Sequence, residues 1–189
     1  MKFITSSFEQ YNSYGIATDI GFFYNDNIND IKASLVFRNI GFQIKPYNEV
    51  NEKLPFEINM GISQKLENAP IIYHVTFENL QKWPIGISNP SRIITDLDGN
   101  ITEENISFFN EILRHTILGV ELFPESFFNI QLGYSFRRSE ELRILEQRNF
   151  SGISFGFGMK FNKLRFNYCH SRYSSASNVN FIGLQLDLN

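Results

Sequence analysis

The chain has 189 residues, of which 20 are Phe and 8 are Tyr, and its formal net charge at pH 7 is -3. This length suits one domain, and the charge does not suggest nucleic acid as a partner. No run of roughly 18 apolar residues is present, so no transmembrane helix is predicted. The single cysteine, Cys169, excludes an intramolecular disulfide and a cysteine cluster for zinc.

The amino-terminal residues 1–7 carry one basic residue and a short apolar stretch before the sequence turns polar. They lack the apolar core of a secretory signal peptide. Lys2–Ser7 is instead a weak candidate for a strand, and Lys32–Ile40 is another.

An alternation of apolar and polar residues with period two runs through most of the chain and predicts strands. In residues 13–24 the even-numbered side chains are mainly apolar, with aromatic residues at both ends, and the odd-numbered ones are mostly small or polar. The strongly patterned segments are Ser13–Tyr24, Leu54–Gln64, Pro70–Glu78, Arg114–Phe123, Phe127–Arg137, Ile153–Phe161, Leu164–Ser171 and Val179–Leu188. Together with the two weaker candidates they make about ten strands.

Both a transmembrane β-barrel and a soluble β-sandwich or lipocalin-like barrel show such alternation. Two details favour the membrane barrel. The polar face of the predicted strands is rich in Gly and Ser rather than in Lys and Glu, and their apolar face is unusually aromatic. In addition, the strands approach the roughly 9–11 residues that a tilted membrane crossing requires. We therefore predict one all-β domain, residues 1–189, folded as an antiparallel transmembrane β-barrel.

The predicted connections alternate between short and long, as in bacterial outer-membrane barrels, which have short periplasmic turns and long outer loops. The short connections are Asn25–Asp30, Leu66–Ala69, Pro124–Ser126 and Asn162–Lys163, and the long ones are Gly41–Lys53, Asn79–Leu113 and Arg138–Phe150. Residues 181–188 resemble the terminal-strand signal of outer-membrane proteins, although the chain ends on Asn189 rather than on an aromatic residue.

The motif Asp96–Asn100 invites a calcium interpretation, but the EF-hand register would need acidic residues where Ile94 and Asn105 stand. An ordinary Asp-Gly turn explains it better. After this turn, Thr102 is the predicted N-cap of one short helix that runs through Leu113 in the long outer loop and covers the barrel mouth.

Several ionisable residues fall on the inward face of the predicted strands, where we expect them to pair with one another. They are Asp19, Arg38, Glu57, His74, Glu78, His115, Glu121 and Arg165. No Ser-His pair is placed by its spacing, so the chain is not predicted to be an enzyme, and no cofactor or metal is expected.

Four arginines cluster in one predicted outer loop: Arg137, Arg138, Arg143 and Arg148. With the neighbouring glutamates they form either a solvated mixed-charge loop or a contact for anionic lipopolysaccharide or a protein partner.

Short motifs spread over the whole chain resemble the PorQ family, the outer-membrane barrels of the type IX secretion system in Bacteroidetes, which is related to PorV and more distantly to FadL-type fatty-acid transporters. These motifs are Lys45–Tyr47, Lys53–Glu57, Arg114–His115, Gly119–Glu121, Gly133–Tyr134, Arg137–Arg138, Glu141–Leu142 and Gly152–Gly158.

The resemblance implies a fourteen-stranded, non-enzymatic barrel of the FadL/PorV type, integral to the bacterial outer membrane. It further implies that the barrel anchors a PorZ-like surface protein in a cargo attachment complex with PorU-like and PorV-like proteins. The alternative is a FadL-type transporter of hydrophobic small molecules. Since about ten strands and no signal peptide are visible, we expect the amino-terminal strands of the family barrel to be missing. The segments Lys2–Ser7 and Val179–Leu188 should then be the two edges of an open wall.

Overall fold

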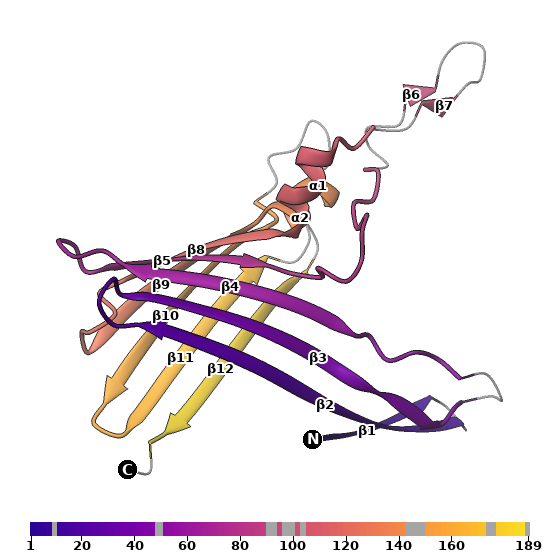
Figure 1. The fold of residues 1–189 in the computed structure, drawn as a ribbon, viewed down its shortest axis with the longest axis horizontal. Helices are drawn as coiled ribbons and strands as arrows, with labels where there is room; N and C mark the ends of the chain where they lie inside the picture. The colour runs from indigo at the N-terminus through magenta and orange to yellow at the C-terminus, as the bar shows by residue number, and fades with distance from the viewer. Residues whose placement is uncertain are drawn as a thin grey trace.

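The computed structural model describes residues 1–8, 11–47, 51–89, 94–95, 101–102, 105–142, 150–172 and 177–187. Ten strands form one antiparallel sheet in which each strand pairs with its neighbours along the chain (Figure 1). These strands are β1 (Lys2–Phe8), β2 (Tyr11–Asp26), β3 (Ile31–Lys45), β4 (Glu57–Lys65), β5 (Ile71–Phe77), β8 (Thr116–Leu122), β9 (Phe128–Ser135), β10 (Ile153–Phe161), β11 (Leu164–Arg172) and β12 (Asn178–Leu186). The predicted all-β, antiparallel architecture is confirmed.

The sheet is open. Strand β1 pairs only with β2 and strand β12 only with β11 in the part of the chain that the structure describes. Both therefore lie at edges, as expected for an open wall, and the sheet is a curved and twisted surface whose two edge strands stay apart (Figure 1).

The period-two pattern divides the sheet into an apolar face and a polar face because successive side chains of a strand point to opposite sides. On the apolar face the cross-strand neighbours Val120, Leu132 and Phe155 belong to three adjacent strands. On the polar face the corresponding row is Gly119, Gly133 and Ser154. The register thus continues each face from strand to strand.

No second layer covers the apolar face among the described residues, since the sheet strands contact one another and the two helices lie at one end. Leu132 in the middle of β9 is 48% exposed and Leu184 in β12 is 71% exposed. The chain of 22.0 kDa has an accessible surface of 13691 Å². A compact soluble monomer of that mass has about 9,300 Å², so these residues do not enclose a core between two layers.

Strands β2 and β3 are the longest, with 16 and 15 residues. Their register shifts between Thr18 and Ile20, where β3 contributes an extra residue and Asn39 adopts a positive φ of 57°. The carboxylate of Asp19 accepts the backbone N–H of Asn39 at 2.9 Å and so supports the bulge. Beyond this point the β2–β3 hairpin extends past β4.

The predicted short helix through Leu113 is present as α1 (Phe108–His115), but its predicted N-cap, Thr102, is wrong. Thr102 belongs to the two-residue strand β7 (Ile101–Thr102), which pairs with β6 (Ile94–Thr95). The described residues also contain a second helix, α2 (Phe136–Glu141). The side chain of Ser107 caps α1, accepting the backbone N–H of Asn110 at 3.4 Å.

The predicted strand bounds were also too long at these helices. Arg114 and His115 end α1, and Phe136 and Arg137 begin α2, although the alternation assigned all four to strands. No helix in the described part of the chain is long and apolar enough to cross a membrane. The calcium-like motif 96–100 lies outside the described residues.

Candidate functional site

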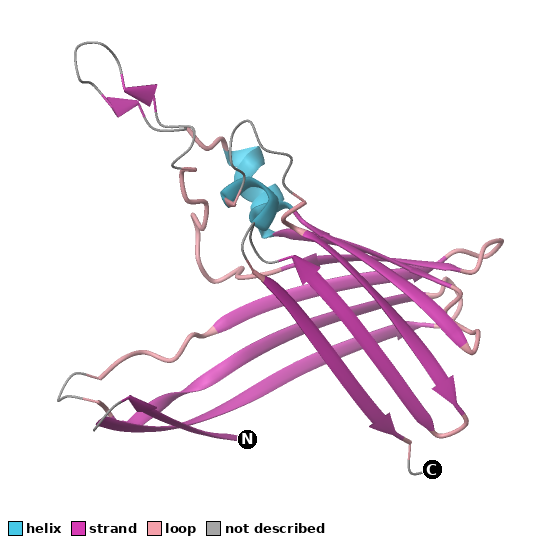
Figure 2. Cartoon of the chain, turned by 180° about the vertical axis from the view of Figure 1, so that it is seen from behind, coloured by secondary structure: helices cyan, strands magenta, loops and turns pink. Residues whose placement is uncertain are grey.

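Most of the buried polar residues of the described structure lie at one end of the sheet. There α1, α2 and the segment 78–89 form one unit, which we call the cap (Figure 2). Helix α1 continues directly into β8, and β9 continues directly into α2. Because neither helix is joined to its strand through a loop, the sheet fixes the position of the cap.

One face of α1 is buried against the segment 78–89. Glu111, Arg114 and His115 are three and four residues apart, so they share this face, and they are only 6%, 3% and 1% exposed. The Glu111 carboxylate accepts the backbone N–H of Ile85, and also that of Gly86 at 2.9 and 3.2 Å. A buried carboxylate thereby satisfies donors of an irregular segment that has no strand partner.

The other two residues of this face fasten the same segment. Arg114 Nη1 donates to the carbonyl oxygen of Ile87 at 3.1 Å. His115 Nδ1 lies 2.6 Å from the carbonyl oxygen of Glu78, and its Nε2 lies 3.9 Å from Glu111 Oε1. Three side chains of one helix therefore hold the segment 78–89 at its beginning and near its end.

Within the cap, Glu141 joins helix α2 to α1 and to the segment 78–89. Its carboxylate accepts from Arg137 Nε at 3.2 Å, lies 3.6 Å from Arg114 Nη1 and accepts the backbone N–H of Ile87 at 3.3 Å. Nearby, Asn89 Nδ2 donates to the carbonyl oxygen of Glu140 at 2.8 Å. The carboxylate is mostly buried, with 17% of its side chain exposed, so these charge-assisted bonds are less screened than surface pairs.

The outer side of the cap carries aromatic residues. The Trp83 ring stacks on the buried His115 ring at a centroid distance of 4.1 Å, and the Phe108 ring lies 6.0 Å from Trp83. Phe108 and Phe109 are 75% and 67% exposed. We call Trp83, Phe108 and Phe109 the aromatic surface; Trp83 and Phe108 border a hollow of about 590 Å³ whose wall also includes Glu111.

Of the four arginines predicted to contact lipopolysaccharide or a partner, Arg137 and Arg138 lie in α2, and Arg143 and Arg148 lie outside the described residues. Arg138 Nη1 donates to Ser171 Oγ of β11 at 2.8 Å, and Arg137 pairs with Glu141. Arg138 thus ties α2 to β11, whereas the Arg137–Glu141 pair lies within α2. Their contact with an external partner stays a prediction.

Glu78, the first residue of the cap after β5, is near the positive charges of α2. Burial raises the pKa of its carboxyl above the ordinary range, because the charged form loses solvation. The charges of Arg137, Arg138 and His115 lower the pKa but do not outweigh burial.

Of the ionisable residues predicted on the inward side, Arg38 pairs with Glu57 as expected, and His74 lies near Glu121. Asp19 and Arg165 pair instead with Lys2 and Asp187, which the prediction did not include. The shortest N–O distances are 2.6 Å for Lys2–Asp19, 3.1 Å for Arg38–Glu57, 3.9 Å for His74–Glu121 and 3.1 Å for Arg165–Asp187. His115, which we predicted on a strand, lies in the cap instead. No group of three or more His, Cys, Asp or Glu residues that could hold a metal ion occurs within the described ranges.

Sequence reasoning missed Glu111, Arg114 and Trp83 as cap residues. The three-residue spacing of the first two on a helix was a usable signal, but their partners at positions 85–87 lie about 25 residues away and in irregular structure.

No known protein-family model matches the chain, and no curated protein matches it either.

Proposed function

We propose that this chain forms the wall of an integral β-barrel of the FadL/PorV type in a bacterial outer membrane. The observation that carries this proposal is the continuous apolar face, which no second layer covers in the described part of the chain. In water such a surface would be a large liability, since monomeric soluble proteins rarely expose apolar patches above a few hundred Å². Lipid tails remove the liability, and the polar face then lines the interior.

The described connections also fit this orientation. The short turns, among them 66–70 and 162–163, lie at one end of the strands, whereas residues 46–47, residues 51–56 and the cap lie at the other. In outer-membrane barrels the long connections face outward. The cap is then exposed at the cell surface, where it can meet another protein.

We further propose that the barrel is non-enzymatic and acts like the PorQ family, anchoring a PorZ-like protein in the attachment complex of the type IX secretion system, with PorU-like and PorV-like proteins nearby. The aromatic surface supports this role because large aromatic residues on a rigid base are typical anchors of protein interfaces. The cap that carries them is fixed by the buried contacts of Glu111 and Arg114.

The test is affinity purification of the tagged protein from outer membranes of cells that have this secretion system. We expect a PorZ-like protein to copurify with the wild type and to be lost with the double variant Phe108→Ser and Phe109→Ser. Both side chains are largely exposed, so the fold should survive their replacement. The matched control is Ile28→Ser, which replaces a 91% exposed residue in the turn at the opposite end and should retain the partner.

The alternative, a FadL-type transporter, receives less support. A site for a fatty acid needs an apolar lining with few polar groups, but the polar face carries paired charges such as Arg38–Glu57 and Lys2–Asp19. Lipid extraction of the purified protein decides between the two proposals. A stoichiometric fatty acid, with no PorZ-like protein recovered, would favour the transporter.

A further inference from the structure

A second surface lies on β3, away from the cap, where the strand continues after β4 has ended. The last pair between the two strands is Arg38 with Glu57, whereas β3 remains paired with β2 as far as Lys45. On its β4 side the segment 39–45 therefore has no neighbouring strand in the described structure. Such an edge presents a row of backbone N–H and C=O groups that can pair with another strand.

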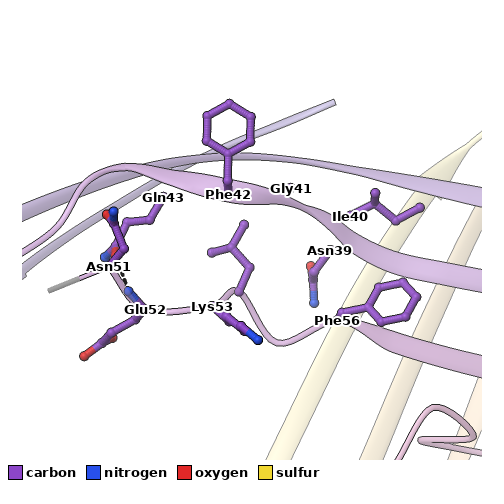
Figure 3. A pocket seen from close by; sticks show the side chains of 10 residues that line it. Asn39, Ile40, Gly41, Phe42, Gln43, Asn51, Glu52, Lys53 and Phe56 are labelled. Atoms are coloured by element: carbon purple, nitrogen blue, oxygen red, sulfur yellow. Dashed lines mark hydrogen bonds between the residues drawn. The ribbon is translucent and has the colours of Figure 1, made fainter.

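The segment 51–56 runs beside this edge without joining the ladder. Among the described residues, no backbone-to-backbone hydrogen bond connects it to residues 39–45. Side chains span the space instead (Figure 3): Gln43 Oε1 accepts the backbone N–H of Glu52 at 2.8 Å, and Asn39 Nδ2 donates to the carbonyl oxygen of Pro55 at 2.8 Å. Two amide side chains thus hold the segment about one side-chain length from the strand.

The space between them is a cavity of about 640 Å³, within the usual range for ligand sites. Its wall is mixed, with Ile40, Phe42, Leu54 and Phe56 beside the polar Asn39 and Gln43. Phe42 points away from the segment 51–56 and is 67% exposed (Figure 3). The site thus combines apolar side chains with a free backbone edge.

We propose that residues 39–45 of β3 bind an extended segment of a partner polypeptide, which adds as a strand on the β4 side of β3 and replaces the two side-chain bridges from Asn39 and Gln43 to the segment 51–56. A row of backbone donors and acceptors is matched by another polypeptide backbone, and strand addition at an open edge is a common form of peptide recognition. A lipid chain offers no hydrogen bonds. This site is separate from the aromatic surface and does not depend on the partner proposed for the cap.

Charge and position add to the assignment. Lys53 lies in the cavity wall and Lys45 lies at the far end of the edge, whereas Glu52 is the acidic residue of the wall. An acidic residue at one end of the incoming segment would therefore be favoured.

The length of β3 places this edge outside the membrane. At about 3.3 Å per residue, β3 is roughly 50 Å long, which exceeds the roughly 25 Å apolar band of an outer-membrane barrel even when the strand is tilted. The edge then projects beyond the bilayer.

The probe is a fluorescent peptide, acetyl-Glu-Val-Thr-Val-Thr-Val-amide, added to the full chain in detergent micelles and followed by fluorescence anisotropy. Its twin carries N-methyl groups on alternate residues, which removes backbone donors and keeps the side chains. We expect saturable binding of the first peptide and at least about tenfold weaker binding of the twin, since main-chain hydrogen bonds supply most of the affinity in this mode. Absence of binding, or equal binding of both peptides, would overturn the proposal.

Two further measurements locate the site. In a Cys169→Ser background, Gln43→Cys and Glu52→Cys are joined by a short thiol-reactive linker, which should weaken peptide binding relative to the same variant before linking. Hydrogen exchange should slow at residues 39–45 when the peptide binds. Protection of the other open edges, at residues 2–8 or 178–186, without protection at 39–45 would refute the assignment, as would a peptide-independent dimer that protects 39–45.

Discussion

Replacing Leu132 with Arg tests whether the apolar face meets lipid. The strand β9 runs from Phe128 to Ser135, so Leu132 lies about half a residue, or roughly 2 Å, from its midpoint. A cationic side chain on the lipid face at mid-bilayer costs about 2–4 kcal/mol. If the same face met water, a substitution at this 48% exposed residue would change stability by less than about 0.5 kcal/mol.

The assay is guanidinium unfolding of the protein extracted from outer membranes and reconstituted in phosphatidylcholine vesicles. Gln131→Arg is the matched control, because Gln131 precedes Leu132 on the same strand and lies on the polar face; it should leave the unfolding midpoint nearly unchanged. At Phe128, near the end of the strand, Arg should cost less than at Leu132, since the penalty falls towards the interface. A cost at Leu132 below about 0.5 kcal/mol, or an equal cost at Gln131, would refute the reasoning.

Three other predictions concern charge, backbone contact and the cap. Burial raises the pKa of Glu78, so between the ordinary and the raised pKa the folded state binds more protons than the unfolded state. Stability therefore falls as pH rises through that window. Glu78→Gln should remove this pH dependence and raise the thermal midpoint of unfolding at neutral pH but not at low pH. Gly41→Ala should cost about 1–3 kcal/mol in guanidinium unfolding, because its Cβ would collide with the β2 backbone, whereas Gly21→Ala, whose nearest neighbour would be 3.8 Å away, should be tolerated. Glu111→Ala leaves buried N–H groups, including that of Gly86, without their acceptor. Limited proteolysis should therefore cut this variant within residues 78–89 faster than it cuts the wild type. Glu111→Gln keeps an acceptor oxygen and should be cut more slowly than Glu111→Ala.

The period-two pattern predicted the sheet well because successive side chains of a strand point to opposite faces along its whole length, one apolar and one polar. It failed where alternation and helix formation fit the same residues. Phe136 and Arg137 continue the alternation of β9, but the Ser135 side chain accepts the backbone N–H of Arg138 at 3.5 Å and starts α2. A local cap, which periodicity does not detect, decided the structure there.

The bulge at Asn39 and the cap could not be predicted from the sequence for a different reason. The positive φ of Asn39 is supported by the Asp19 carboxylate on the neighbouring strand, and Glu111 finds its partners in a segment without regular structure. Both depend on contacts between residues distant in the sequence, and no local pattern encodes such contacts. The predicted pairing of inward charges succeeded, as for Arg38 with Glu57, because adjacent strands bring equivalent positions together.

The stacking of Trp83 on His115 has a practical consequence for spectroscopy. Trp83 is the one tryptophan of the chain, and it lies in the cap rather than in the sheet. Its emission therefore reports on the cap alone, against a background of tyrosines excited at shorter wavelengths. Release of the segment 78–89 would separate the indole, which is already 45% exposed, from the buried imidazole and so change its emission. In the purified protein, reconstituted in vesicles, the movement of one short segment can thus be followed without any added label.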